Sequence, residues 1–202
     1  MDGVSEFSQR FRRSPDTETG DLFFQGTGIS KGIELLAQKK TGRMTGWASY
    51  TLGKVEYQFD VFNRGEEFPA DQDRRHEIKL VGSFKLGKWM LSSTWVFASG
   101  TPYTAPESQY SIELLDGTLR GFTHVGDKNQ NRLPSYHRMD MSLSRQFITN
   151  NLRWDLGLSI FNLYGHTNVW YREFILDTSP IIIRDVTTLG FTPTVSLKVN
   201  LK

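Results

Sequence analysis

Residues 152–162 read LRWDLGLSIFN, and apolar and polar side chains alternate along this stretch with a period of two. Successive side chains of a β-strand point to opposite faces, so the pattern predicts a strand with one apolar face and one polar face. The apolar face is expected to carry Leu152, Trp154, Leu156, Leu158 and Ile160. Arg153 and Asp155 are expected on the opposite face.

The same period recurs along most of the chain. The expected strands are 29–40, 44–58, 76–86, 88–99, 137–147, 151–163, 168–176 and 191–202, with a further strand near 4–11 and an extension of the last hairpin over 181–189. Most of these runs have about 10 residues or more, whereas strands of globular proteins usually have about 5–6. A tilted membrane strand needs roughly 9–11. Strand length therefore favours a barrel wall over a β-sandwich.

The connections between these strands differ sharply in length. Three are tight and contain Gly42, Gly87 or Asn150, residue types that supply the positive φ angles of hairpin turns. Two are long, at 59–75 and 100–136, and an Asp-Gly pair inside the second predicts a small separate hairpin. No repeat or low-complexity tract divides the chain, so we expect one structural unit.

Composition narrows the possible partners. The 202 residues include 24 Lys and Arg against 22 Asp and Glu, a net charge of +2, so nucleic acid is not an expected partner. Hydrophobic residues make up 38% and aromatic residues 13%, which suits a barrel wall and also a soluble β-sandwich. The chain has no cysteine, which excludes disulfides and thiolate metal sites.

The first residues, MDGVSE, have neither a basic segment nor an apolar one, so they are not expected to be a signal peptide. No stretch approaches the roughly 18–20 apolar residues of a membrane helix. A soluble cytoplasmic protein and a piece of a longer protein with its leader upstream both fit these two observations.

Five motifs occur in an order and spacing that resemble the barrels of TonB-dependent receptors. They are SKGIELL at 30–36, TGWASYTL at 45–52, FPADQDRRHE at 68–77, LPSYHRMDMS at 133–142 and LGLSIFNLY at 156–164. They are similar to the "GvEl" strand, the strand after it, the "P…D.RH" turn, the "lP.Yhr.Dls" strand and the "NLF/NLY" strand of receptors of the Bacteroidetes type. The resemblance covers roughly residues 25–202.

This resemblance implies an all-β fold: an antiparallel transmembrane β-barrel segment, about eight strands of a barrel of roughly 22. Residues 29–202 would be the C-terminal strands, and 1–28 the partly ordered end of a preceding strand and loop. The implied function is TonB-dependent uptake of a scarce solute, such as a siderophore, cobalamin or a glycan, across the bacterial outer membrane, without enzymatic activity. The implied partners are the lipid bilayer, the plug domain and remaining barrel, and indirectly the TonB complex.

The chain departs from the family pattern in lacking the leader, TonB box and plug, and in ending on Lys202 instead of an aromatic residue. If 168–176 and 191–202 are consecutive wall strands, both long connections fall at the end where 191–202 terminates, the periplasmic end. The apolar face of each strand is then expected on the convex, outer side. Two alternatives stay open: a soluble β-sandwich binding module, and a small stand-alone eight-strand membrane barrel.

Asp73, Arg74, Arg75 and His76 concentrate charge at the start of one strand. Adjacent side chains of a strand cannot all face one pocket, and no Ser or Cys nucleophile lies in a recognisable elbow nearby. We therefore expect a structural turn anchor at the barrel rim, with Asp and Arg paired, and no catalytic role.

The remaining polar residues predict no metal or cofactor site. The four histidines, His76, His124, His137 and His166, lack metal-ligand spacing. The acidic residues Glu66, Glu67, Asp71 and Asp73 lack the spacing of a calcium loop and indicate a solvated loop. Trp89 and Trp154, each near the start of a strand, suit the aromatic girdle at a membrane interface.

Overall fold

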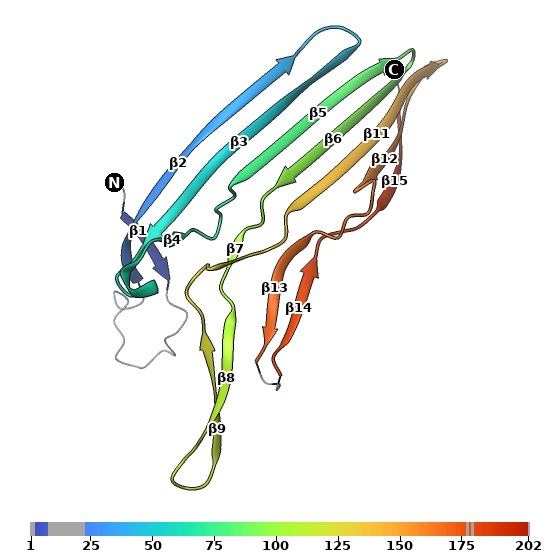
Figure 1. Cartoon of the computed structure of the whole chain (residues 1–202). Helices are drawn as coiled ribbons and strands as arrows, with labels where there is room; N and C mark the ends of the chain where they lie inside the picture. The colour runs from blue at the N-terminus through green and yellow to red at the C-terminus, as the bar shows by residue number, and fades with distance from the viewer. Residues whose placement is uncertain (1–2, 8–22, 177, 179, 202) are drawn as a thin grey trace.

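The computed structural model describes residues 3–7, 23–176, 178 and 180–201, and within them the chain is all-β with antiparallel pairing (Figure 1). The main sheet has nine strands. Eight follow the order β1 (Gly3–Phe7), β2 (Phe23–Lys39), β3 (Met44–Gln58), β5 (His76–Leu86), β6 (Trp89–Ala98), β11 (Tyr136–Thr149), β12 (Leu152–Phe161) and β15 (Thr192–Leu201). The short β4 (Phe68–Pro69) pairs with β3 beside this path.

Three two-stranded sheets lie in the long connections. They are β7 (Pro102–Tyr103) with β10 (Asn131–Arg132), β8 (Pro106–Glu113) with β9 (Leu119–Val125), and β13 (Val169–Ile175) with β14 (Ile182–Thr187). A 3₁₀ turn, η2 (Asn63–Gly65), lies between β3 and β4. Within the described ranges, no helix has the length and apolar character needed to cross a membrane.

The alternation of apolar and polar residues predicted the bounds of most wall strands closely. The expected strands 44–58 and 76–86 coincide with β3 and β5, and β2 begins at Phe23, earlier than the expected residue 29. The hairpin expected inside 100–136 is β8–β9, and its turn has Gly117 at φ 77°. The tight turns hold Gly42, Gly87 and Asn150 at positive φ, as predicted. Most of the segment 1–28, including 8–22, lies outside the described residues, and so does the expectation that it is partly ordered.

The prediction that 168–176 is a wall strand is wrong. This segment forms β13, which pairs with β14 outside the main sheet, and β12 pairs directly with β15 instead. The chain leaves the sheet just after β12, where Asn162 and Gly165 adopt φ of 54° and 63°. Both values lie in the left-handed region, which bends the backbone away from the extended path of a strand.

Because β13 is not part of the main sheet, the long connections lie at the opposite end from the one predicted. Leu201, at the end of β15, pairs with Leu152, at the start of β12, so the last strand ends beside the tight turns. The long connections 59–75, 99–135 and 162–191 all lie at the opposite end of the sheet (Figure 1). The expectation that they lie where the last strand terminates is therefore wrong, and the cause is the displaced strand β13.

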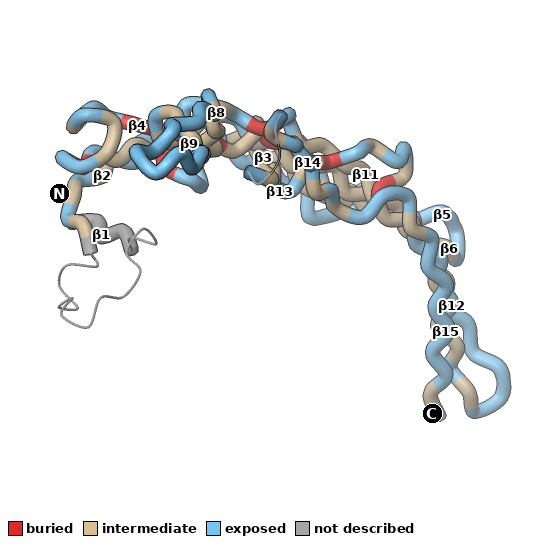
Figure 2. The backbone as a smooth tube through the Cα atoms, turned by 90° about the horizontal axis from the view of Figure 1, so that it is seen from below, coloured by how far each residue is buried: buried red, intermediate tan, exposed pale blue. Residues whose placement is uncertain are grey.

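The sheet is a single curved layer, as predicted, and not two stacked sheets (Figure 2). The solvent-accessible surface of the chain is 14836 Å², whereas a compact protein of this mass exposes roughly 9,700 Å². In the described part of the chain only five apolar residues are buried: Phe59, Phe68, Ala70, Ala98 and Leu133. The sheet does not close, because no pairing among the described residues joins its end strands, β1 and β15.

Candidate functional site: a two-faced wall and a loop cluster

The strand register divides the wall into two chemically different faces. Residues that pair across neighbouring antiparallel strands project to the same face. One face is apolar and uncharged over nine residues in each of five strands, at 44–52, 78–86, 89–97, 152–160 and 193–201. This length matches the roughly 9–11 residues of a tilted membrane strand.

Much of this apolar face is open to the surroundings. Ile33 is 62% exposed, Leu35 61%, Val195 72% and Leu197 61%. Soluble monomers rarely expose contiguous apolar patches larger than a few hundred Å². Such a face needs an apolar environment or a covering partner.

Basic residues border the apolar face at both ends. On the side of the tight turns, Lys39 is the next residue of β2 after Ala37 that projects to this face. Arg145 of β11 also projects to it, between Leu156 and Trp89, with its guanidinium 5.2 Å from the ring centre of Trp89. On the side of the loops, Lys31 pairs with Lys54 across β2 and β3. Cations therefore lie at both ends of the uncharged band in β2, and Arg145 of β11 lies on the same face at the depth of Leu156.

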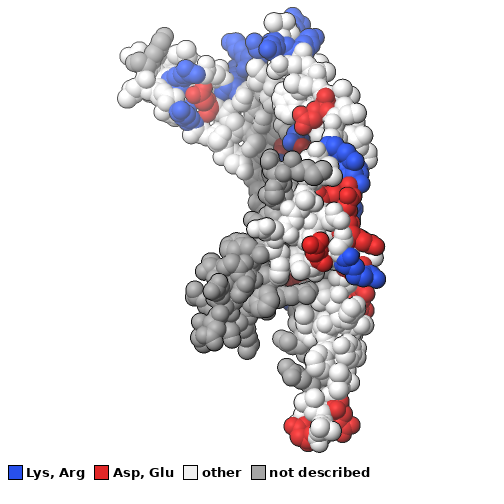
Figure 3. All heavy atoms as spheres, turned by 90° about the vertical axis from the view of Figure 1, so that its left-hand side faces the viewer, with Lys and Arg blue, Asp and Glu red and all other residues white. Residues whose placement is uncertain are grey.

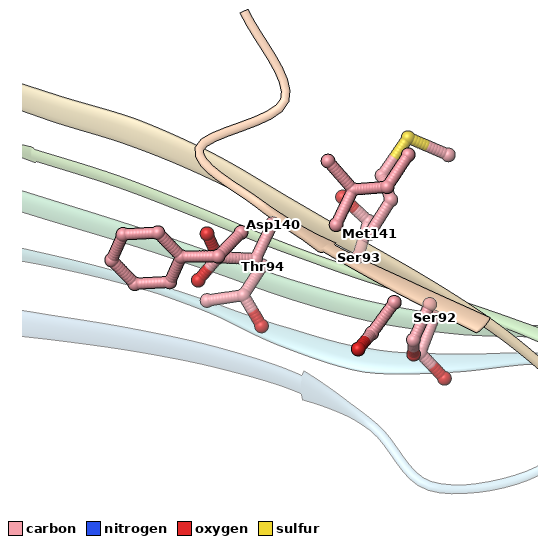
Figure 4. A pocket seen from close by; sticks show the side chains of 9 residues that line it. Ser92, Ser93, Thr94, Asp140 and Met141 are labelled. Carbon is pink, nitrogen blue, oxygen red and sulfur yellow. The ribbon is translucent and has the colours of Figure 1, made fainter. Parts of the chain in front are cut away.

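The opposite face carries Ser, Thr and ion pairs. Arg138 and Asp140 approach to 3.0 Å, and Arg153 and Asp155 to 3.6 Å. Figure 4 shows Met141 on one side of the sheet and Ser92, Thr94 and Asp140 on the other.

A hollow of about 400 Å³ on this polar face is lined mainly by the side chains Gln146, Arg153, Asp155, Lys198 and Asn200. The predicted separation of Leu156 and Val195 from Arg153 and Lys198 is confirmed by the register. That the apolar face is the convex one stays a prediction.

The loops at the far end are tied to one another by specific polar contacts. Arg172 of β13 donates to both carboxylate oxygens of Asp185, at 2.6 and 2.9 Å, and to the Tyr103 hydroxyl at 2.8 Å. The hydrogen bonds to Asp185 raise the pKa of Arg172, and those from Arg172 lower the pKa of the Asp185 carboxyl. The Gln109 amide donates to the Leu176 carbonyl at 2.8 Å. Hairpins β8–β9 and β13–β14 are thus joined.

A second set of contacts joins the loops 59–75 and 100–136. The Asn63 side chain accepts from the Lys128 backbone N–H at 2.7 Å and donates to its carbonyl at 3.1 Å. The buried Asn129 amide donates to the Pro69 carbonyl at 2.8 Å and to Asp71. Phe59 and Phe68 stack beneath them with ring centres 6.1 Å apart. The three long connections are called the loop cluster below, and the part around Phe59 and Phe68 has a small core of its own.

Asp73 is fully buried at the base of the loop cluster. Its carboxylate accepts the Val55 backbone N–H at 2.7 Å and forms a short ion pair with Arg132, whose other nitrogen donates to the Gly100 carbonyl at 3.1 Å. Arg75 also approaches the Asp73 carboxylate, at 3.8 Å. No local pattern around Asp73 indicates Arg132 as a partner, because the two residues are 59 positions apart.

Arg74 and His76 point to other partners. Arg74 approaches Glu77 at 3.9 Å, and the His76 ring shares a 2.9 Å hydrogen bond with the Tyr50 hydroxyl. The His76 backbone N–H donates to the Ser99 hydroxyl at 3.1 Å. Arg75 contacts Asp73, whereas Arg74 and His76 contact other neighbours, so the four side chains do not converge on one pocket. Their role as a turn anchor stays a prediction, now with defined partners.

Two further asparagines fix the point where the chain leaves β12. The fully buried Asn162 side chain accepts from the His166 backbone N–H at 3.1 Å and donates to the carbonyls of His166 and Leu189. The Asn168 side chain accepts from the backbone N–H of His137 at 2.9 Å and donates to its carbonyl at 3.0 Å. The sequence interpretation missed both, since a local pattern does not reveal which loop asparagine becomes buried.

No group of three or more His, Cys, Asp or Glu in the described ranges could hold a metal ion. The rings of His137 and His166 stack with centres 3.6 Å apart, a packing contact and not a ligand arrangement. The acidic residues expected to form one solvated cluster are separated, because Asp73 is buried with its arginines while Glu66 is exposed.

No protein-family model, curated protein or solved structure matches this chain. The geometry of the wall and the five sequence motifs are therefore the grounds on which a function is proposed.

Proposed function

We propose that this chain forms part of the wall of an outer-membrane β-barrel receptor of the TonB-dependent type. The observation that carries the proposal is the apolar face, uncharged over nine residues in five of its strands, on a sheet one layer thick. In water this face would be exposed to solvent, whereas in a bilayer it would contact lipid acyl chains. The polar face, with its Ser, Thr and ion pairs, suits a hydrated lumen.

The distribution of turns and loops supports the same proposal. Outer-membrane barrels have short periplasmic turns and long extracellular loops. Here the tight turns at 40–43, 87–88 and 150–151 share one end, and the loop cluster lies at the other. We therefore assign the tight turns to the periplasmic side and the loop cluster to the outside.

Aromatic residues also fit a membrane interface. Trp89 and Trp154 both lie on the apolar face and close to the tight turns. Indole rings favour the headgroup region, where one edge is apolar and the other is wet. Trp95 lies in the middle of the same face and is not part of this girdle.

The open edges of the sheet require further strands. Each unsatisfied backbone group in hydrocarbon costs several kcal/mol, so an exposed edge at that depth is not tolerated. We propose that the remaining barrel pairs with β15 and with the N-terminal edge, and that a plug domain fills the lumen. The activity proposed for the complete receptor is uptake of a scarce solute, such as a siderophore, cobalamin or a glycan, driven through the TonB complex.

A pair of substitutions on adjacent residues tests the proposal. Leu197→Arg places a charge on the apolar face, and the matched control Ser196→Arg places one on the polar face of the same strand. Arginine on the lipid face at mid-depth costs about 2–4 kcal/mol. We expect Leu197→Arg to reduce recovery of the protein from outer membranes as a folded, protease-resistant species, and Ser196→Arg to leave it unchanged. Equal recovery of both variants would contradict the proposal.

A further inference from the structure

A hollow of about 590 Å³ interrupts the apolar face near the tight turns. Its floor is formed by small residues that pair across three strands, Gly46, Gly82 and Ser93, and its wall includes Leu80 and Trp95. This volume lies within the roughly 300–1,000 Å³ of small-molecule sites. A Cβ added at Gly82 would meet no atom within 4 Å, so the space above that residue is open.

The hollow ends at a group of cations. Lys39 lines it directly, and Lys40 and Arg43 lie in the adjoining turn. The neighbouring turn adds Lys88, and the two hairpins are joined by a hydrogen bond from the Lys85 backbone N–H of β5 to the Arg43 carbonyl at 2.9 Å. Figure 3 shows Lys and Arg gathered at this end of the molecule.

None of the side chains of these four residues, Lys39, Lys40, Arg43 and Lys88, forms an ion pair within the part of the chain that the structure describes. The two turns themselves, 40–43 and 87–88, contain no Asp or Glu. The positive charge beside the hollow is therefore available to an external anion.

We propose that this hollow binds an anionic phospholipid from the leaflet at the tight-turn end of the wall. One acyl chain lies over Gly82 between Leu80 and Trp95, and the phosphate lies against Lys39, Lys40 and Arg43. Charge complementarity selects the anionic headgroup, because basic clusters at the edge of an apolar span attract such lipids. The inference rests on the proposed function, since the apolar face must lie in a bilayer.

The fluorescence of Trp95 reports whether a lipid chain occupies the hollow. The protein is extracted from the membranes in which it is made and reconstituted into phosphatidylcholine vesicles containing either phosphatidylglycerol or phosphatidylcholine with brominated acyl chains. Quenching by bromine requires contact with the indole, and comparison with Trp95→Phe isolates the contribution of this residue. We expect brominated phosphatidylglycerol to quench Trp95 at lower mole fractions than brominated phosphatidylcholine does.

Two variants and one control test the two halves of the site. Gly82→Leu fills the hollow and should remove the preference for phosphatidylglycerol; its backbone is not in the left-handed region, so the new side chain is tolerated. Replacing Lys39, Lys40 and Arg43 with Gln should weaken the preference roughly fivefold for each cation removed. The control Lys31→Gln, on the same face of β2 but at its loop side, should leave it unchanged.

The possible outcomes separate the site from the proposed function. Equal quenching of Trp95 by both brominated lipids, or a preference that survives Gly82→Leu, overturns the lipid site and leaves the membrane wall standing. Quenching of the other tryptophans with Trp95 shielded, in a protein that runs as an oligomer, overturns it in favour of a second copy of this chain. No quenching of any tryptophan would instead contradict the proposed function itself.

Discussion

The half of the sheet near the tight turns and the half that carries the loop cluster are stabilised in different ways. Near the turns the wall has backbone ladders, alternating faces and hairpins of a few residues. At the loop end, all four buried polar residues of the described chain, Asp73, Asn129, Asn162 and Asn168, form hydrogen bonds to segments far away in sequence. A regular wall tolerates many side chains of the right polarity, whereas the loop cluster depends on particular residues.

The largest effect is expected at Asp73. Asp73→Ala leaves Arg132 without its carboxylate and the Val55 N–H without its acceptor. Removing one partner of a buried pair costs about 3–5 kcal/mol, and the partial exposure of Arg132 places the expected loss at the lower end. Limited proteolysis should show rapid cleavage within 59–75 while the wall strands stay protected.

The matched control for this prediction is Asp127→Ala. Asp127 pairs with Arg64 at 3.4 Å in the same loop cluster, but both side chains are largely exposed. Exposed pairs contribute about 0–1 kcal/mol, so the cleavage rate should change little. Equal sensitivity of the two variants would remove the distinction between the two halves of the sheet.

Asn162 is expected to have the next largest effect, since its side chain fixes the exit from β12. Asn162→Gly keeps the left-handed backbone but leaves the partly buried backbone N–H and carbonyl of His166 without partners, at about 1–3 kcal/mol. Asn162→Ala adds backbone strain of roughly 1–2 kcal/mol. The midpoint of denaturant unfolding should therefore fall in the order wild type, Asn162→Gly, Asn162→Ala. If Asn162→Ala is no less stable than Asn162→Gly, the left-handed conformation is not decisive there.

A smaller effect is expected in the tight turn between β5 and β6. Gly87→Ala forces a side chain into a φ of 62° and should destabilise the hairpin by roughly 1 kcal/mol. The control Gly121→Ala, in β9, introduces a Cβ with no neighbour within 4 Å and no left-handed strain. The difference between their unfolding midpoints measures how much the turn itself contributes. Identical midpoints would indicate that the ladder alone sets the register.

The smallest effect concerns pH. The hydrogen bonds from Arg172 lower the pKa of Asp185 below its usual 3.8. The stability from this contact is therefore present above pH 3.8 and is lost as the pH falls through the lower pKa of the folded state. Amide exchange in β13–β14 should be constant from pH 7 to 4, after correction for intrinsic rates, and protection should fall only at lower pH. Asp185→Asn should abolish that acid-dependent step, and a step above pH 4 would contradict the assignment.

Alternation predicted much of the wall because it is a local property. The bounds of β3 and β5, the positive φ of Gly42 and Gly87, and the division of β12 into an apolar and a polar face followed from residues a few positions apart. A buried or lipid-facing side requires apolar residues at every second position whichever neighbour the strand pairs with. The sequence therefore contains this information without reference to the rest of the chain.

The local sequence pattern did not predict which strands and side chains pair with one another. The segment of β13 has the composition of a wall strand, but the turn at Asn162 and the contacts of Asn168 with His137 direct it into the loop cluster and bring β15 against β12. The ion pair of Asp73 with Arg132 joins positions 59 residues apart in the same way. By itself the sequence determined the strands, their turns and their two faces, because these depend on near neighbours. The order of the strands, the end at which the loops lie and the buried polar contacts were decided by tertiary structure, because each depends on which distant segments meet.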